Sequence, residues 1–390
     1  MKQVLGALAA LLVSAFVLTI GHGLALLVMP LRAEIIGFSP VDISLTGSAY
    51  YAGFVAGCFA SPALIARVGH VRMYAVFGAA LIVTLLAVHM ATALWSWLLL
   101  RAATGVLMAG QFMVIETWLN ERASASTRGR VLAIYVLVTL AANTFGQLLV
   151  NVAPVQAETL FALSAMLVAL SIVPVGLSAA ELPAPLTSAR VALGLLWRLA
   201  PVGFVGATAS GFITGASGAL NAVFVRGVGF DVFAVSVYTS AVIAGGAVFQ
   251  YPVGRIADRI DRRSTLMGLF TGVAGVSCLA IVVTLSRPDW LPFVGFCWGG
   301  MAHCIYASAL AHANDRAPPC EIVGIGGAIL VMWGVGAVIG PLGASLCMDL
   351  LGSIGFFVWM IAAGLLALVL ALLLRAGILR PGLAAAGAMD

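Results

Sequence analysis

Long apolar runs alternate with short polar segments along the whole chain. About 20 helical residues, at ~1.5 Å each, cross a hydrocarbon core ~30 Å thick, and runs of this length recur from one end of the sequence to the other. Polar loops, Pro and Gly residues and charges mark where each run ends. The predicted transmembrane helices are 4–29, 44–66, 73–94, 98–119, 131–152, 159–179, 199–224, 232–254, 264–285, 291–312, 322–346 and 353–374.

Arginine and lysine are distributed unevenly between the two faces of this twelve-span arrangement. If the N-terminus is cytoplasmic, segments on that side hold 15 of the 19 Lys and Arg residues. The positive-inside rule therefore predicts that both termini are cytoplasmic. The first run is too long for the apolar region of a signal peptide, so we expect it to be retained. The outer half keeps only Arg32, Arg101, Arg226 and Arg287.

The amino-acid composition is that of a membrane protein and excludes several kinds of partner. Hydrophobic residues make up 63% of the chain and charged residues 8%, which is typical of a protein embedded in a bilayer. The net charge of +5 follows from the topology, and no basic patch alternates with aromatic residues, so we expect no nucleic-acid partner. The cysteines lack the spacing of a metal site, so we expect them to pack as small apolar side chains and to bind no cofactor. They are Cys58, Cys278, Cys297, Cys304, Cys320 and Cys347.

The chain repeats itself at a shift of 192 to 194 residues. The stretch "NERA" at 120–123 returns as "NDRA" at 314–317, and Gly146 corresponds to Gly340. We therefore predict two six-helix bundles in the same orientation, covering 1–180 and 199–376. A short cytoplasmic linker at 181–198 joins them, and a cytoplasmic tail follows at 377–390. Such parallel repeats are typical of secondary transporters that bind substrate between the two halves near the bilayer midplane.

The most polar stretch of the chain carries a family resemblance. "GRIADRIDRR" at 254–263 resembles the G-x-x-x-D-R-x-G-R-R signature of the major facilitator superfamily, with Asp261 in place of the second glycine. The first-half copy, "PALIARVGHVR" at 62–72, has Pro62 and Ala66 where the glycine and aspartate belong, and it retains Arg67. The resemblance implies a cytoplasmic gate. Its residues would be Gly254, Asp258, Arg259, Arg262, Arg263 and Arg67.

Further stretches extend the resemblance over the whole chain. "ERASASTRGR" at 121–130 and "RAATG" at 101–105 look like family motifs after and within the fourth span, and "GVGAVIGPLGA" at 334–344 looks like a Gly-Pro motif placed in span eleven. The overall pattern is similar to small bacterial drug and metabolite carriers. It implies an all-α transporter in the inner membrane whose cavity is lined by spans one, four, seven and ten.

The physical role of the 254–263 segment follows from its charges. Asp258 lies where a span ends, and three arginines follow on the cytoplasmic face. Carboxylates and guanidinium groups form directed, partly desolvated pairs and also cap helix ends. We therefore predict a latch that holds the cytoplasmic side shut across the boundary between the halves. The alternative interpretation is a solvated loop that only fixes topology.

Ionisable residues within spans are costly, at ~2.5–3.5 kcal/mol or more, and usually face a partner or a water-filled cavity. Glu116 is the acidic residue that lies clearly within a span, so it is the predicted proton-coupling site, together with Arg101 in the same span. Glu116 could instead pair with Arg128 or Arg130, and Arg101 could extend toward the membrane surface.

Polar side chains at helical spacing indicate where a substrate binds. Span five carries Thr139, Asn143, Gln147 and Asn151 at intervals of four, and span seven carries a similar ladder beside a glycine stripe, which alternatively means close helix packing. The histidines could also be neutral packing residues. The cavity candidates are mostly neutral, which favours a neutral or zwitterionic solute with a flat ring. The predicted binding residues are His22, Gln111, Asn143, Gln147, Asn221, His303 and Tyr306.

These observations predict secondary active transport of a small organic solute, coupled to protons. The chain has no Walker loop, G-x-S-x-G or HExxH motif, so we expect no enzyme activity and no ATP-driven step. On resemblance, export of drug-like or metabolite compounds is favoured over uptake of a vitamin such as riboflavin. A sensor that binds without translocating is the alternative from another class. The expected partners are the substrate, protons and the lipid bilayer, for a monomer.

Overall fold

The computed structural model describes residues 2–122, 128–177, 191–318 and 321–379. Within these ranges the chain is helical and contains no strand. The first half forms α1 (Lys2–Ile35), α2 (Pro40–Val68), α3 (His70–Met90), α4 (Leu94–Arg122), α5 (Arg128–Leu148), the 3-10 turn η1 (Leu149–Val152) and α6 (Thr159–Gly176). The second half forms α7 (Leu193–Leu199), α8 (Pro201–Gly227), α9 (Val232–Arg259), α10 (Arg262–Ser286), η2 (Pro288–Trp290), α11 (Leu291–Asn314), α12 (Ile322–Leu351), η3 (Gly352–Ile354) and α13 (Gly355–Arg375).

Several helices extend beyond the apolar runs from which they were predicted. α2 begins at Pro40 because Ser39 and Asp42 form a capping box: the Asp42 backbone N–H donates to Ser39 Oγ at 3.1 Å, and the Ser39 N–H donates to Asp42 Oδ2 at 3.0 Å. The proline at the first helical position has no N–H to leave unpaired. Hydropathy does not detect such polar first turns.

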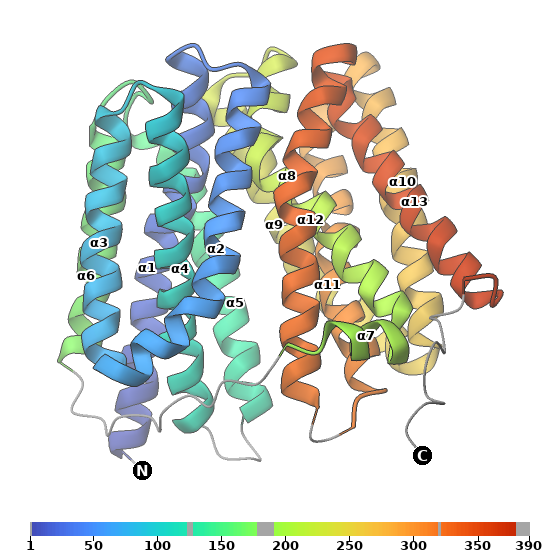
Figure 1. Cartoon of the computed structure of the whole chain (residues 1–390). Helices are drawn as coiled ribbons and strands as arrows, with labels where there is room; N and C mark the ends of the chain where they lie inside the picture. Colours follow the sequence, from blue (N-terminus) through green and yellow to red (C-terminus); the bar gives the residue numbers. More distant parts are fainter. Residues whose placement is uncertain (1, 123–127, 178–190, 319–320, 380–390) are drawn as a thin grey trace.

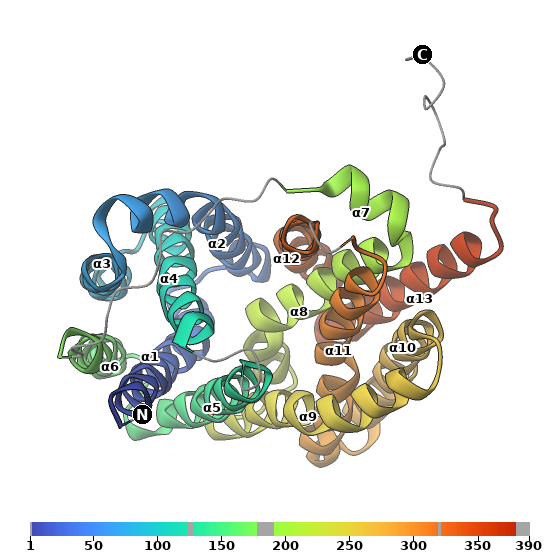
Figure 2. The same ribbon diagram turned by 90° about the horizontal axis from the view of Figure 1, so that it is seen from below.

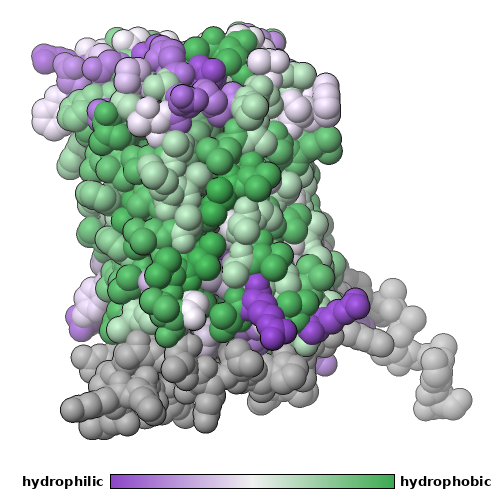
Figure 3. Space-filling view, turned by 90° about the vertical axis from the view of Figure 1, so that its left-hand side faces the viewer, coloured by the Kyte–Doolittle hydropathy of each residue, from purple (hydrophilic) through white to green (hydrophobic). Residues whose placement is uncertain are grey.

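Eleven helical segments in the described part of the chain are long and apolar enough to cross a membrane. The last of them, Ile322–Arg375, contains both α12 and α13, which are separated by a turn with Gly352 at φ +68°. Only a short turn divides these two helices, so the apolar pattern continues through it. Figure 3 shows the result on one face, where apolar side chains form a broad band below a polar upper rim.

The long helices form two bundles that lie side by side (Figure 1). Helices α1–α6 pack together, as do α8–α13. Glycines allow the closest approaches. A Cβ on Gly53 would lie 1.9 Å from the Ala102 carbonyl oxygen, which brings α2 against α4. A Cβ on Gly245 would lie 1.8 Å from the Phe296 carbonyl oxygen, which brings α9 against α11 in the second bundle.

Helix α7 lies against the lower end of the second bundle, as seen from below in Figure 2. Leu196 is buried with Ile325 and Ile329 of α12, and Trp197 meets Phe204 edge-on with ring centroids 5.1 Å apart. The helix falls at the end of the predicted linker 181–198, of which residues 181–190 lie outside the described residues. Residues 380–390 of the predicted tail also lie outside them.

The two bundles meet near the end of the molecule where α1 ends and α2 begins, which is the upper end in Figure 1. Ser345 Oγ donates to Ser44 Oγ at 2.9 Å, and Asn151 Nδ2 donates to Ser236 Oγ at 2.9 Å. Glu34 and Arg226 add a cross-bundle ion pair at 3.9 Å. The hydrogen bonds and ion pairs that described residues form between the bundles therefore lie in the upper half.

Candidate functional site

A cavity of about 490 Å³ lies between the two bundles. Its volume falls in the range of small-molecule sites. Helices α1, α2 and α5 line it from the first bundle, and α8, α9, α11 and α12 line it from the second. None of the described residues that line it is Asp, Glu, Lys or Arg. They include Leu26, Tyr51, Phe54, Asn143, Gln147, Ser210, Thr214, Ser217, Asn221, Thr239, Gln250, His303, Tyr306 and Trp333.

The polar ladder of α8 faces this cavity. Ser210, Thr214, Ser217 and Asn221 all line it, and Asn221 Nδ2 donates to Ser217 Oγ at 2.8 Å. Two glycines beside the ladder pack against α12: a Cβ on Gly211 would lie 2.0 Å from the Trp333 carbonyl oxygen, and one on Gly215 would lie 2.6 Å from the Ala337 Cα. Both interpretations of this segment therefore apply, each to a different face of the same helix.

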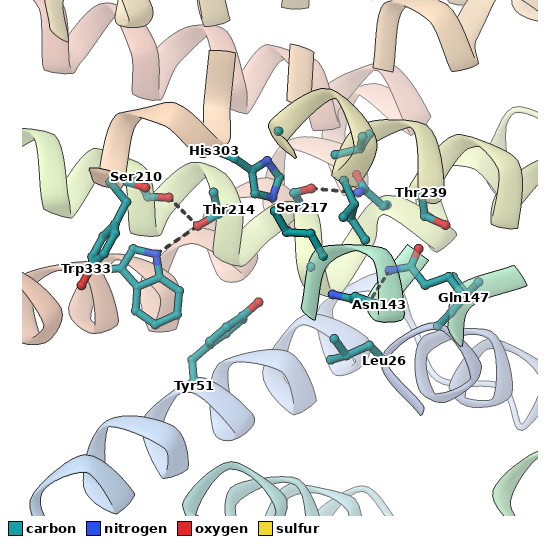
Figure 4. Close-up of a pocket in the computed structure, with 18 of the residues that line it drawn as sticks. Leu26, Tyr51, Asn143, Gln147, Ser210, Thr214, Ser217, Thr239, His303 and Trp333 are labelled. Atoms are coloured by element: carbon teal, nitrogen blue, oxygen red, sulfur yellow. Dashed lines mark hydrogen bonds between the residues drawn. The ribbon is translucent and has the colours of Figure 1, made fainter. Parts of the chain in front are cut away.

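Helix α5 contributes two amide side chains. Asn143 and Gln147 line the cavity, and Gln147 Nε2 lies 3.5 Å from Asn143 Oδ1 (Figure 4). The other two residues of the α5 ladder have hydrogen-bond partners outside the cavity lining. Thr139, one turn below, donates to the Val136 carbonyl at 3.0 Å, and Asn151, one turn above, reaches Ser236 of the other bundle.

Aromatic side chains form another part of the wall. Trp333 of α12 meets Tyr51 of α2 edge-on at 5.7 Å between ring centroids, and it meets Tyr306 of α11 at 6.3 Å. Its Nε1 donates to Thr214 Oγ1 at 3.1 Å, which fixes the indole against α8. His303, also on α11, lines the cavity while its Nδ1 lies 3.0 Å from the Gly299 carbonyl oxygen.

Five of the seven predicted binding residues thus line the cavity: Asn143, Gln147, Asn221, His303 and Tyr306. The other two lie inside the first bundle. His22 Nε2 contacts Tyr50 Oη at 3.2 Å, and Gln111 Nε2 donates to the Tyr74 carbonyl at 3.2 Å.

Other residues that line the cavity were not predicted from the sequence. Tyr51 and Trp333 were not among the predicted binding residues, and helical spacing gave no signal for Thr239 and Gln250 of α9. Their type is too common in spans to indicate a cavity.

The two predicted proton-coupling residues lie in different surroundings. Arg101 is 6% exposed, places its guanidinium 4.6 Å from the centre of the Tyr50 ring and donates to Met29 Sδ at 3.0 Å, so it does not extend to the surface. Glu116 is exposed and accepts a hydrogen bond from Tyr135 Oη at 3.2 Å. The side chains of Arg128 and Arg130 lie outside the described residues.

The predicted cytoplasmic gate forms ion pairs inside the second bundle. Arg262 Nε lies 2.5 Å from Asp315 Oδ2, and Arg262 Nη2 lies 3.8 Å from Asp258 Oδ1. Nearby, Arg316 Nη1 lies 2.8 Å from His312 Nδ1. The pKa of Arg316 is lowered, mainly by partial burial and to a smaller extent by the positive charge of Arg263. Gly254, Arg259 and, in the first bundle, Arg67 are exposed. Among the described residues, no hydrogen bond or ion pair joins these side chains to the first bundle, so the contact predicted across the boundary remains a prediction.

The chain is similar in sequence to bacterial proteins that are named as membrane transporters. The chain is 26% identical over 308 residues to the uncharacterised MFS-type transporter YcaD of Salmonella arizonae, covering 77% of this chain and 78% of the relative. It is 24% identical over 339 residues to the MFS-type transporter Ent638_1421 of Enterobacter sp., covering 86% and 87%. The relatives are named as transporters without a substrate.

Solved structures share the fold at low sequence identity. The nucleoside transporter NupG superposes with a TM-score of 0.78 at 13% identity, covering 95% of this chain and 99% of that one. An inward-facing bacterial homologue of the lysosomal transporter Spinster gives 0.74 at 14%, covering 95% and 96%. The sequence pattern of the Major Facilitator Superfamily matches residues 11–202 and again 202–386. The chain therefore belongs to the major facilitator superfamily of membrane transporters.

Proposed function

We propose that the chain moves a small, neutral organic solute across the inner membrane of a bacterium by alternating access, as a monomer coupled to protons. The observation that carries this proposal is the cavity between the bundles, which lies below the cross-bundle contacts of the upper ends. A solute bound there would change sides when the upper contacts break and the lower ends close. Bacterial relatives of the same family support the location.

The lining supports the choice of a neutral solute. A dicarboxylate or phosphorylated compound would lose its water without gaining a charged partner, because the described lining residues include no Lys or Arg. Tyr51, Tyr306 and Trp333 instead offer aromatic surface for a flat ring. Export is the direction that the resemblance to drug and metabolite carriers favours, with uptake of a ring-containing nutrient as the alternative.

Glu116 is the proposed proton carrier. Its carboxylate is exposed in the lower half of α4 and accepts a hydrogen bond from Tyr135. A proton from the cytoplasm could reach it in this open conformation. Protonation would remove its charge, which is the kind of local change that biases an equilibrium between two transporter states.

The proposed topology has two six-helix repeats in the same orientation and both termini in the cytoplasm. The two consecutive family matches support it. So do glycine contacts that recur at equivalent places: a Cβ on Gly146 would lie 2.2 Å from the Ile20 carbonyl oxygen, and one on Gly340 would lie 2.3 Å from that of Phe212. A reporter fused after Asp390 should be cytoplasmic, and a tag near Asp289 should react from outside. An external C-terminus would overturn the topology.

The experiment that tests the function is flux into proteoliposomes. Purified protein is first screened by ligand-induced thermal shift across drugs, vitamins, sugars and amino acids. Each stabilising compound is then assayed for uptake into vesicles with and without an imposed proton gradient. Gradient-dependent accumulation supports the proposal and gives the direction. Binding without flux would overturn it in favour of a sensor.

A further inference from the structure

The amide side chains of α5 leave hydrogen-bonding atoms unused inside the cavity. Gln147 is 7% exposed, and its Oε1 has no hydrogen-bond partner among the described residues. Asn143 is half-buried, and its contact with Gln147 uses Asn143 Oδ1, which leaves Asn143 Nδ2 without a hydrogen bond to a described residue. A buried polar atom without a partner is costly, so such atoms in a cavity indicate where a ligand completes the bonding.

The unused atoms have a defined pattern. When two neighbouring amides share one hydrogen bond, one NH2 group and one C=O group take no part in it, and this remains true if both amide groups are turned over. The α5 wall therefore offers a donor beside an acceptor. The complementary ligand edge has an N–H beside a C=O, as in a ring amide or imide. Asn221 on α8, 8% exposed, adds a second unpartnered carbonyl oxygen, Oδ1.

The rest of the cavity restricts the body of the ligand. Figure 4 shows Asn143 and Gln147 side by side, facing Ser217 and Thr239, with Tyr51 and Trp333 toward the other end. The tryptophan is held in place by its bond to Thr214 and by edge-on contact with Tyr51. A flat ring can pack on this fixed aromatic surface while its polar edge reaches α5. No charged side chain among the described lining residues would compensate a charged ligand.

We propose that Asn143 and Gln147 are specificity-determining residues that recognise a neutral, flat heterocycle through an N–H donor next to a C=O acceptor. This inference rests on the proposed function, since it names the class of solute that the transporter carries. A site built to satisfy such an edge discriminates strongly against an analogue that lacks the donor, because its own acceptor is then left unpaired.

The test uses matched pairs of compounds on the unmodified protein. Uracil, hypoxanthine and riboflavin each carry the edge, and 1,3-dimethyluracil, 1-methylhypoxanthine and 3-methylriboflavin keep the ring while replacing the N–H of that edge. Binding is measured by thermal shift and by isothermal titration. At least one parent compound should bind about 10- to 100-fold more tightly than its methylated partner. Equal binding within the pairs, or binding by none of the parents, would overturn the proposal.

Variants then locate the discrimination. Gln147→Leu and Asn143→Leu should reduce the difference between the parent and methylated compounds to less than about threefold. Thr139→Val, one turn away on α5 and outside the described lining, should preserve the difference. Discrimination that survives in both leucine variants would assign recognition to other residues and would overturn the role of the amide pair.

Flux measurements separate this inference from the proposed function. A heterocycle that binds with the expected discrimination but is not moved across proteoliposomes would overturn transport and leave the recognition standing. Accumulation of a solute without an N–H beside a C=O would overturn the recognition and leave transport standing.

Discussion

At the scale of single residues, Glu116 is the proposed proton carrier, which is exposed in the lower half of α4 and bonded to Tyr135. Glu116→Gln keeps the side-chain volume and a carbonyl oxygen that can accept the Tyr135 hydrogen bond, and it removes the titratable group. We expect gradient-driven accumulation in proteoliposomes to fall at least about tenfold, while exchange of labelled for unlabelled solute continues. Exchange does not require the empty, protonated carrier to return.

A matched variant tests whether the carboxylate itself matters. Tyr135→Phe removes the hydrogen bond and leaves the acid, so accumulation should persist with a shifted dependence on pH. If Glu116→Gln accumulates solute as the unmodified protein does, the proton site lies elsewhere, with His303 the next candidate because it lines the cavity.

Residue type and helical spacing were enough to predict Asn143, Gln147 and Asn221 as cavity residues, since amides are rarely placed in a span without a polar environment. The same reasoning also selected His22 and Gln111, which do not line this cavity. Each finds its polar partner within its own bundle, at Tyr50 and at the Tyr74 carbonyl. Polarity predicts that a partner exists, whereas the direction of the side chain depends on which neighbouring helix packs against that face.

At the scale of helices, α8 separates its packing face from its cavity face. A Cβ on Gly211 would meet backbone of α12 at 2.0 Å, whereas one on Gly218 would meet only the hydroxyl of Tyr51 in the other bundle at 2.3 Å. Gly211→Ala should therefore force α8 and α12 apart and lower the unfolding temperature in detergent by several degrees, an effect of roughly 1–3 kcal/mol. Gly218→Ala should preserve the unfolding temperature and change the Kd of the solute. Equal unfolding temperatures for the two variants would contradict this division of faces.

Apolar periodicity predicted the positions of the helices because each run must cover a fixed membrane thickness. It could not predict their polar extensions. The first turn of α2 depends on the Ser39–Asp42 capping box, and α7 depends on burial of Leu196 against α12. These ends are set by hydrogen bonds and tertiary contacts that leave no mark on hydropathy.

At the scale of the whole molecule, the upper contacts hold the bundles together in this conformation. Ser44 of α2 and Ser345 of α12 approach to 2.9 Å between hydroxyl oxygens. With both residues replaced, as Ser44→Cys and Ser345→Cys, oxidation should join the thiols and trap this conformation. We expect transport to stop under oxidant and to recover with reductant. Each single variant should transport solute under both conditions. An oxidised double variant that still transports would show that these ends do not need to separate.

The proposed alternating access requires a second state in which the lower end is closed, and Asp258 is the carboxylate predicted to hold that end. In this structure the pair of Asp258 with Arg262 is long, at 3.8 Å, and exposed, so it contributes no more than ~0.3–0.5 kcal/mol, while Arg262 lies closer to Asp315. Asp258→Asn should thus leave the unfolding temperature nearly unchanged. If the carboxylate contacts the first bundle on closure, that contact would stabilise the closed state by ~1–3 kcal/mol. Its removal would shift the ratio of the two states by roughly 5- to 150-fold toward the open one.

This shift is measured by the thiol reactivity of Val136→Cys, which places a cysteine on the part of α5 that lines the cavity. Reactivity should rise with Asp258→Asn, and transport should slow more than binding weakens. Asp261→Asn makes the same change of charge three residues later and serves as the control, since Asp261 forms no described ion pair. Unchanged reactivity and normal transport in Asp258→Asn would leave the 254–263 segment with one role, in which its arginines fix the topology of the chain.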